Sequence, residues 1–142
     1  MANYHFDKLF DPSEADELIP VIAPLLQKLQ DASRELGVKI EALAVEDPAI
    51  ERMQLPQIIE RRPELRELAA QMANAAHAIE SYGCFLKDID LGLIDFPWEI
   101  EEGNVVFLCW QPGEHQIVAW HPVEGGFAQR RPIPGATKQY LN

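Results

Sequence analysis

The aromatic residues of this chain avoid most of its first half. No Phe, Tyr or Trp lies between residues 11 and 81, whereas nine of them follow from Tyr82 onward. Aromatic side chains favour strands, and the Ala, Leu and Glu that fill the first half favour helices. We therefore predict one α+β domain over residues 1–142, with an antiparallel helical hairpin at 11–83 and an antiparallel β-meander with a C-terminal tail at 84–142.

The first predicted helix has a clear start and a regular apolar stripe. Asp11 and Glu14 stand at the N-cap and N3 positions of a capping box, with a proline at N1. Apolar residues then recur at alternating spacings of three and four, which is typical of a coiled-coil-like seam between two helices. These residues are Ala15, Leu18, Ile22, Leu25, Leu29, Ala32 and Leu36.

Two prolines and a glycine bear on the course of this helix. Pro20 and Pro24 lie off the seam, and each removes a backbone donor, so the helix is expected to bend there. Gly37 is a plausible C-cap, and continuation of the helix as far as Ala44 is the alternative.

A second helix with the same periodicity completes the predicted hairpin. Pro56 or Pro63 opens it, and Gly83 ends it. Two helices alone leave too much apolar stripe uncovered, so the β half or a second copy of the chain must cover the rest. This excess predicts a homodimer. The seam residues are Leu65, Ala69, Met72, Ala76 and Ile79.

The second half predicts a meander of short strands. Turn residues separate its apolar runs, and Pro97 is expected to end strand pairing because it has no backbone donor. The predicted strands are residues 85–89, 93–96, 105–110 and 117–121.

The last hairpin also has a predicted register. A tip symmetric about the middle of its turn pairs Trp110 with Ile117 and Val106 with His121. Successive side chains of a strand alternate between faces, so this register places Cys109 and His121 on opposite faces.

Charge and length exclude several classes of protein. The net charge of −11 argues against nucleic-acid binding, which needs clustered Lys and Arg. No run of 18 apolar residues or signal peptide is present, so we expect a cytoplasmic protein with Cys84 and Cys109 reduced. Residues 84–124 carry eight acids and one Lys, and a basic tail follows with Arg130, Arg131 and Lys138. This tail is expected to dock on an acidic surface of its own or a neighbouring chain.

Four segments carry a resemblance to a known family. They are FDPSEADELIP at 10–20, GLIDFP at 92–97, LCWQPGE at 108–114 and WHPVEGGFAQRRP at 120–132. On these motifs the chain resembles the bacterial domain-of-unknown-function family number twenty-two-oh-three. The resemblance implies a small cytoplasmic protein with a helical hairpin before a β segment, and it supplies no activity and no catalytic residues.

Polar side chains near the last hairpin are candidates for a binding site. His121, Glu114, Arg130 and Cys109 have the chemistry to bind a metal, an anion or a substrate carboxylate. Glu114 and His121 are seven residues apart, roughly 23 Å along an extended strand, so they meet only if the tip curls back or a second subunit intervenes. The structural alternative is a half-buried His121 bonded to backbone, with Glu114 on a turn. The candidate ligand-binding residues are Asp95, Trp110, Glu114, Trp120, His121, Arg130 and Arg131.

A glycine-rich stretch offers a second candidate. The glycines of 125–127 followed by Arg130 and Arg131 could hold a phosphate or carboxylate. The alternative is a turn whose arginines pair with the surplus acids of the protein itself.

These features favour an interaction or small-ligand-binding module that forms a homodimer, with a small anionic ligand or a protein as partner. No cofactor, nucleic acid or membrane is predicted. The alternative is a metal- or anion-dependent enzyme that uses His121, Glu114 and Arg130.

Overall fold

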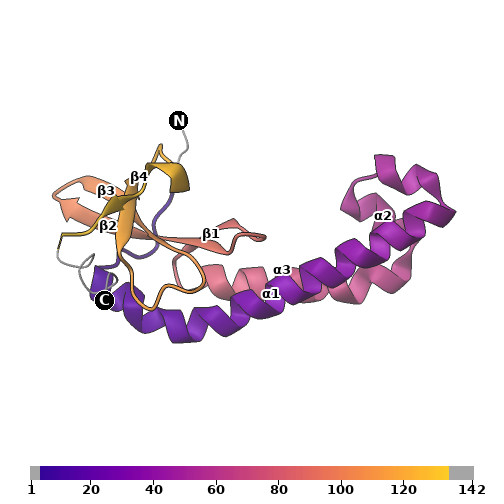
Figure 1. The fold of residues 1–142 in the computed structure, drawn as a ribbon, viewed down its shortest axis with the longest axis horizontal. Coiled ribbons are helices and arrows are strands. Elements are labelled where there is room, and N and C mark those ends of the chain that lie inside the picture. Colours follow the sequence, from indigo (N-terminus) through magenta and orange to yellow (C-terminus); the bar gives the residue numbers. More distant parts are fainter. Residues whose placement is uncertain (1–3, 135–142) are drawn as a thin grey trace.

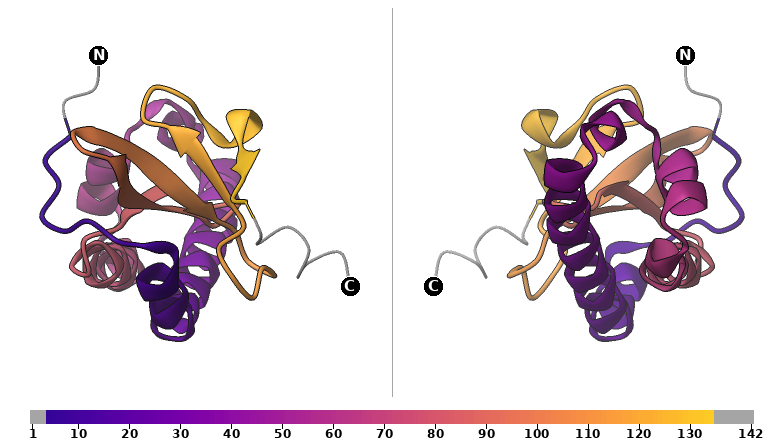
Figure 2. Two further views of the ribbon diagram at one scale, coloured as in Figure 1. Left: turned by 90° about the vertical axis from the view of Figure 1, so that its left-hand side faces the viewer. Right: turned by 90° about the vertical axis from the view of Figure 1, so that its right-hand side faces the viewer.

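The computed structural model describes residues 4–134 and shows an elongated α+β fold (Figure 1). α1 runs along the molecule, and α3 returns beside it in the opposite direction (Figure 1). The sheet lies over the paired ends of these two helices (Figure 2). The predicted α+β class and the order of helices before strands are therefore confirmed. The helices are α1 (Pro12–Glu46), η1 (Pro48–Arg52), α2 (Leu55–Arg61), η2 (Pro63–Leu65) and α3 (Arg66–Glu80).

The start of α1 has the capping box that the sequence predicts. Asp11 Oδ1 accepts the Glu14 backbone N–H at 2.8 Å, and Glu14 Oε1 accepts the Asp11 backbone N–H at 3.1 Å. The helix continues through Gly37, so the predicted cap at that glycine is wrong and the alternative of a longer helix is right. α1 ends at Glu46 because Asp47 leaves the helical region immediately before a proline.

The return limb of the hairpin is more divided than the sequence predicts. Pro56 and Pro63 both open helical segments, since each stands in the first turn of a short helix before α3 begins. These short segments form a separate apolar cluster at the far end of α1. Its buried members are Leu36, Ile50, Ile58 and Leu65.

The buried face of α1 is wider than a two-helix seam. Leu26 is buried, whereas the predicted seam residues Leu18 and Leu25 are only partly buried. One end of α1 packs against both the sheet and α3, so its apolar face must cover two neighbouring elements. The buried residues of α1 are Ala15, Ile22, Leu26, Leu29, Ala32 and Leu36.

The sheet is an antiparallel meander, as predicted, with the order β1-β2-β3-β4-β5. One face packs on α1 and α3 through Ile94, Phe96, Leu108 and Trp110. The strands are β1 (Phe85–Asp88), β2 (Leu93–Glu101), β3 (Asn104–Trp110), β4 (Ala119–Pro122) and β5 (Arg131–Pro132).

β2 continues through Pro97, so the prediction that pairing stops there is wrong. Pro97 stands opposite Phe107 of β3, and its carbonyl accepts the Phe10 backbone N–H at 2.7 Å. The N–H and C=O of a residue in an antiparallel strand point to the same side. The donor that Pro97 lacks would therefore point away from β3, where the ladder does not need it.

The predicted register of β3 and β4 is wrong by one residue. Phe107 lies opposite His121, and Cys109 lies opposite Ala119. The connection is not a symmetric turn, because the Ile117 N–H bonds to Asp16 Oδ1 of α1 at 2.6 Å and β4 begins only at Ala119. A slip of one residue exchanges the two faces of a strand. Cys109 and His121 therefore share a face instead of opposing one another.

Gly92 and Gly37 provide a matched test of the close contact between the turn before β2 and Pro112. Gly92 has a φ of +73°, and a Cβ there would lie 2.6 Å from Pro112 Cγ, whereas a Cβ at Gly37 meets nothing within 4 Å. We expect Gly92→Ala to lower the free energy of unfolding by about 1–3 kcal/mol, because it adds backbone strain and a clash. Gly37→Ala should raise it by roughly 0.5–1 kcal/mol, since alanine favours a helix interior. Urea unfolding measures both, and a neutral Gly92→Ala would contradict the described contact.

Two further predictions concern membrane-spanning helices and the basic C-terminal tail. Within residues 4–134, no helix combines the length and apolar character needed to cross a membrane. Lys138 of the predicted basic tail lies outside the described residues.

Candidate functional site

A cluster of three polar side chains lies on the sheet face turned away from the helices. Asp95 of β2 stands directly opposite Cys109 of β3, and His121 of β4 lies on the same face two residue pairs further along. The exposed fractions of the three residues are 2%, 1% and 2%. One oxygen, sulfur or nitrogen atom from each lies within 4.8 Å of the other two. Three neighbouring strands thus bring three potential metal ligands together.

His121 is bonded through both of its ring nitrogens. Nε2 lies 2.9 Å from Asp95 Oδ2, and Nδ1 lies 2.8 Å from the carbonyl oxygen of Pro122. A ring with a proton on each nitrogen can donate to both of these oxygens, so the two contacts favour the imidazolium form of His121. Burial lowers the pKa of His121, but the hydrogen bonds to Asp95 and Pro122 and the carboxylate charge raise it further, so its net shift is upward.

This ion pair predicts a pH dependence of stability. A histidine whose pKa rises on folding stabilises the fold fully below its unfolded pKa of about 6.5 and loses this effect as pH rises through the folded pKa. With a chelator present, we expect the free energy of unfolding to fall as the pH rises above about 6.5, by at most about 1.4 kcal/mol per pH unit for one proton. Urea titrations measure this slope. His121→Phe should remove it and His77→Gln should keep it, and equal slopes in all three proteins would contradict the assignment.

Two further atoms of the cluster have unusual environments. Burial, reinforced by the charge of Asp95, raises the pKa of the Cys109 thiol to about 12, so the unliganded thiol is a poor nucleophile. Within residues 4–134, the buried Asp95 Oδ1 makes no hydrogen bond of regular geometry, although the Cys109 thiol interacts with the Asp95 carboxyl group. An unsatisfied buried carboxylate oxygen is costly, and it marks a position where a ligand would be stabilised.

Lys87 and the N-terminal segment lie beside the cluster. Lys87 Nζ lies 4.0 Å from Asp95 Oδ2, 4.3 Å from the ring centroid of Tyr4 and 4.5 Å from that of Phe107, and it donates a hydrogen bond to Tyr4 Oη. Tyr4 and Phe6 stack with ring centroids 5.8 Å apart.

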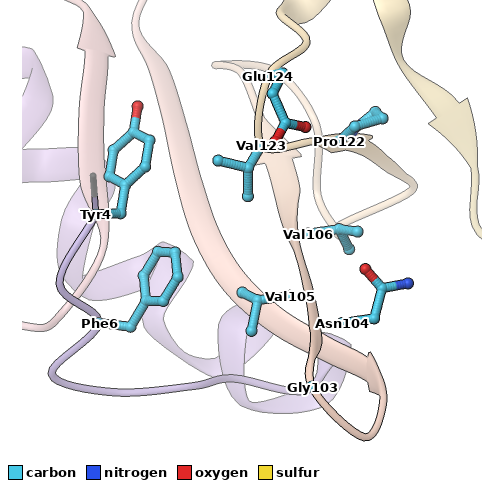
Figure 3. Close-up of a pocket in the computed structure, with 9 residues that line it drawn as sticks. All are labelled: Tyr4, Phe6, Gly103, Asn104, Val105, Val106, Pro122, Val123 and Glu124. Atoms are coloured by element: carbon cyan, nitrogen blue, oxygen red, sulfur yellow. The ribbon is translucent and has the colours of Figure 1, made fainter. Parts of the chain in front are cut away.

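An open pocket of about 420 Å³ separates this segment from the tips of the strands. Figure 3 shows Tyr4 and Phe6 on one side of the pocket and Val105 and Val123 on the other. Pro122, whose carbonyl bonds to His121, also lines the pocket. The pocket thus borders the N-terminal segment and the residue after His121, and none of the three cluster residues lines it.

The remaining predicted site residues form a second group. Arg130 Nη2 donates to Glu114 Oε2 at 2.7 Å and to the carbonyl oxygen of Cys109 at 3.3 Å. Trp110 Nε1 donates to the backbone carbonyl of Glu114 at 2.8 Å, so this group holds the loop between β3 and β4. Arg130 thus pairs with Glu114, an acid of the protein itself. This agrees with the alternative to an anion site that the sequence left open for residues 125–131.

The structure divides the predicted trio of His121, Glu114 and Arg130 into these two groups. Asp95 contacts His121, and Glu114 contacts Arg130. Cys109 belongs to the first group through its side chain and contacts Arg130 of the second group through its backbone carbonyl. The other two candidates lie beside them, with the Arg131 guanidinium 5.1 Å from the Trp120 ring.

Sequence reasoning missed Lys87 and Tyr4 as neighbours of the site. Lys87 is the one basic residue among eight acids between 84 and 124, and this isolation was a usable signal. No comparable pattern pointed to Tyr4, because its position depends on how the N-terminal segment crosses the sheet. Cys109 was considered but separated from His121 by the register error.

The fold and the cluster define a small α+β protein with a buried Asp, Cys and His on the outer face of its sheet. The chain belongs to the family described as "Uncharacterized conserved protein (DUF2203)", whose model matches residues 8–133 of 142. The resemblance noted from the sequence is thereby confirmed. No curated protein and no solved structure matches the chain.

Proposed function

We propose that this protein is a small-ligand-binding module and that its ligand is a zinc ion held by Asp95, Cys109 and His121. The observation that supports this most strongly is the convergence of three different ligand types within 4.8 Å at a buried position. The buried Oδ1 of Asp95 is a second reason, since no regular hydrogen bond within residues 4–134 satisfies it.

The chemistry of the donor set favours zinc over other divalent ions. Thiolate sulfur, imidazole nitrogen and carboxylate oxygen together suit Zn²⁺, whereas Mg²⁺ and Ca²⁺ prefer oxygen alone. Ligand atoms around a tetrahedral zinc lie about 3.3–3.8 Å apart, given bond lengths near 2.0–2.3 Å. The present spacing, from 2.9 Å between His121 and Asp95 up to 4.8 Å, needs only small side-chain movements to reach this range.

The balance of charge also supports a divalent ion. In the unliganded cluster, burial holds Cys109 as a thiol, and the two hydrogen bonds of His121 favour a second ring proton. A zinc ion bound to a thiolate and a neutral imidazole would replace these two protons with equal charge. Zinc binding would therefore leave the net buried charge unchanged.

The proposal predicts one bound zinc per chain. Protein purified without a His tag, stripped with a chelator and dialysed against Zn²⁺ should retain one equivalent by elemental analysis. Binding should also raise the free energy of unfolding, by about 2.7 kcal/mol at a zinc concentration 100 times the dissociation constant. Cys109→Ser and His121→Gln should lose both effects, whereas Cys84→Ser and His77→Gln should keep them. Absence of zinc from the intact protein, or its retention by Cys109→Ser, would contradict the proposal.

A second proposal is self-association into a homodimer. Val38 and Val45 stand seven residues apart on α1 and are 63% and 83% exposed, which places apolar surface on one stripe of the helix. Light scattering on the intact chain should give twice the monomer mass, and replacing both valines by Glu should give the monomer mass. A strictly monomeric intact chain would contradict this second proposal alone.

A further inference from the structure

We infer that residues Tyr4 to Phe6 form a hinged cover that controls the access of ions to the Asp95, Cys109 and His121 cluster. This inference rests on the proposed zinc site, but it concerns the segment of chain that lies over it. All three cluster residues are at most 2% exposed, so a hydrated ion cannot reach them unless part of the structure moves.

The cover contacts the immediate neighbours of the cluster. The Tyr4 ring meets the Phe107 ring edge-on at 5.1 Å, and the Phe107 ring lies 5.6 Å from the His121 ring. Phe6 contacts the same Phe107 ring at 6.0 Å. Displacement of Tyr4 and Phe6 would therefore uncover the Phe107 ring, which in turn lies against His121.

Lys87 connects the cover to the carboxylate beneath it. Its ammonium donates to Tyr4 Oη and lies 4.0 Å from Asp95 Oδ2. Lysine holds this position on a flexible stem of four methylene groups, so it can swing outward with the cover. The contact between Lys87 and Tyr4 is thus the latch that keeps the cover closed.

The cover is attached more weakly than the strands below it. Tyr4 and Phe6 are only partly buried, while His5 and Asp7 are exposed. Among the described residues, the first backbone hydrogen bond from this segment to the sheet is made by Phe10. Segments with few backbone hydrogen bonds open locally without global unfolding. Phe10 is therefore the fixed end, and the hinge lies between it and Phe6.

The open pocket beside the cover gives the segment room to move. It lies between Tyr4 and Phe6 on one side and the ends of β3 and β4 on the other (Figure 3). Tyr4 and Phe6 both line this volume of about 420 Å³, so each ring has space beside it on the pocket side.

The reactivity of the Cys109 thiol tests the cover without any metal. In a Cys84→Ser background, Cys109 is the one thiol of the chain, and its labelling by dithiobis(nitrobenzoate) reports how often the cluster opens. Tyr4→Ala with Phe6→Ala should accelerate labelling at least about tenfold, and Lys87→Met should accelerate it by a smaller factor. The same variants should bind and release zinc faster by similar factors. Tyr82→Ala, which removes an exposed tyrosine beyond the end of α3, is the matched control and should change neither rate.

Each outcome separates the cover from the zinc site. If labelling accelerates but no variant binds zinc, the cover stands and the proposed ligand is wrong. If zinc binds but labelling is unchanged in the cover variants, the inference is overturned. Labelling that varies with urea as steeply as global unfolding would also overturn it, since the thiol would then be reached only through the unfolded chain. Circular dichroism and melting temperature verify that each variant is folded.

Discussion

Replacement of Asp95 by Ala should lower the free energy of unfolding by about 3–5 kcal/mol in metal-free buffer. Its carboxylate pairs with the His121 imidazolium at 2.9 Å, and both side chains are 3% exposed. Removal of one partner leaves the other charge buried without compensation, which is among the most costly changes in a protein interior. Urea unfolding in the presence of a chelator measures the loss.

A double-mutant cycle separates this effect from lost packing. Replacing both members, with Asp95→Leu and His121→Phe together, should cost much less than the sum of the two single changes, because no unpaired charge remains. Asp90→Ala, which removes an exposed acid from the turn before β2, should stay within about 0.5 kcal/mol of the intact protein. Additive single and double changes would show that the two groups do not act as a pair.

The second large effect is expected at Phe96, on the opposite face of the same strand. Phe96 is completely buried and meets the Phe10 ring edge-on at 5.3 Å, at the junction of the sheet with the helices. Phe96→Ala should lower the free energy of unfolding by about 3–5 kcal/mol, because it removes a large apolar side chain and leaves a cavity.

A surface substitution provides the control for Phe96. Leu91→Ala removes apolar atoms from a side chain that is 63% exposed, so its effect should stay within about 0.5 kcal/mol. Comparable losses for the two variants would contradict the position of Phe96 in the main core.

The helical half of the fold was predictable because its signals are local. The capping box at Asp11 and Glu14 and the periodic apolar residues of α1 depend on neighbours within a few positions of the chain. The interrupted return limb was harder to predict, because Pro56 and Pro63 are both compatible with a helix start and only the distal apolar cluster favours the use of both.

The sheet was predictable in order but not in register. The register between β3 and β4 depends on the position of Ile117, whose backbone N–H bonds to the side chain of Asp16. Asp16 is 101 residues earlier in the chain, so no local pattern could indicate this contact. This long-range contact decides whether Cys109 and His121 share a face. The candidate site followed the same pattern: Asp95 and His121 were identified by residue type, and their convergence with Cys109 required the three-dimensional structure.

The most direct test of the proposed zinc site is the absorption spectrum of the Co²⁺-loaded protein. Cobalt takes tetrahedral positions of zinc, and a bound thiolate adds a charge-transfer band in the near ultraviolet. We expect a one-to-one titration with tetrahedral visible bands and this charge-transfer band, which Cys109→Ser should abolish and Cys84→Ser should preserve. A spectrum of hydrated Co²⁺, or a thiolate band that survives in Cys109→Ser, would contradict it.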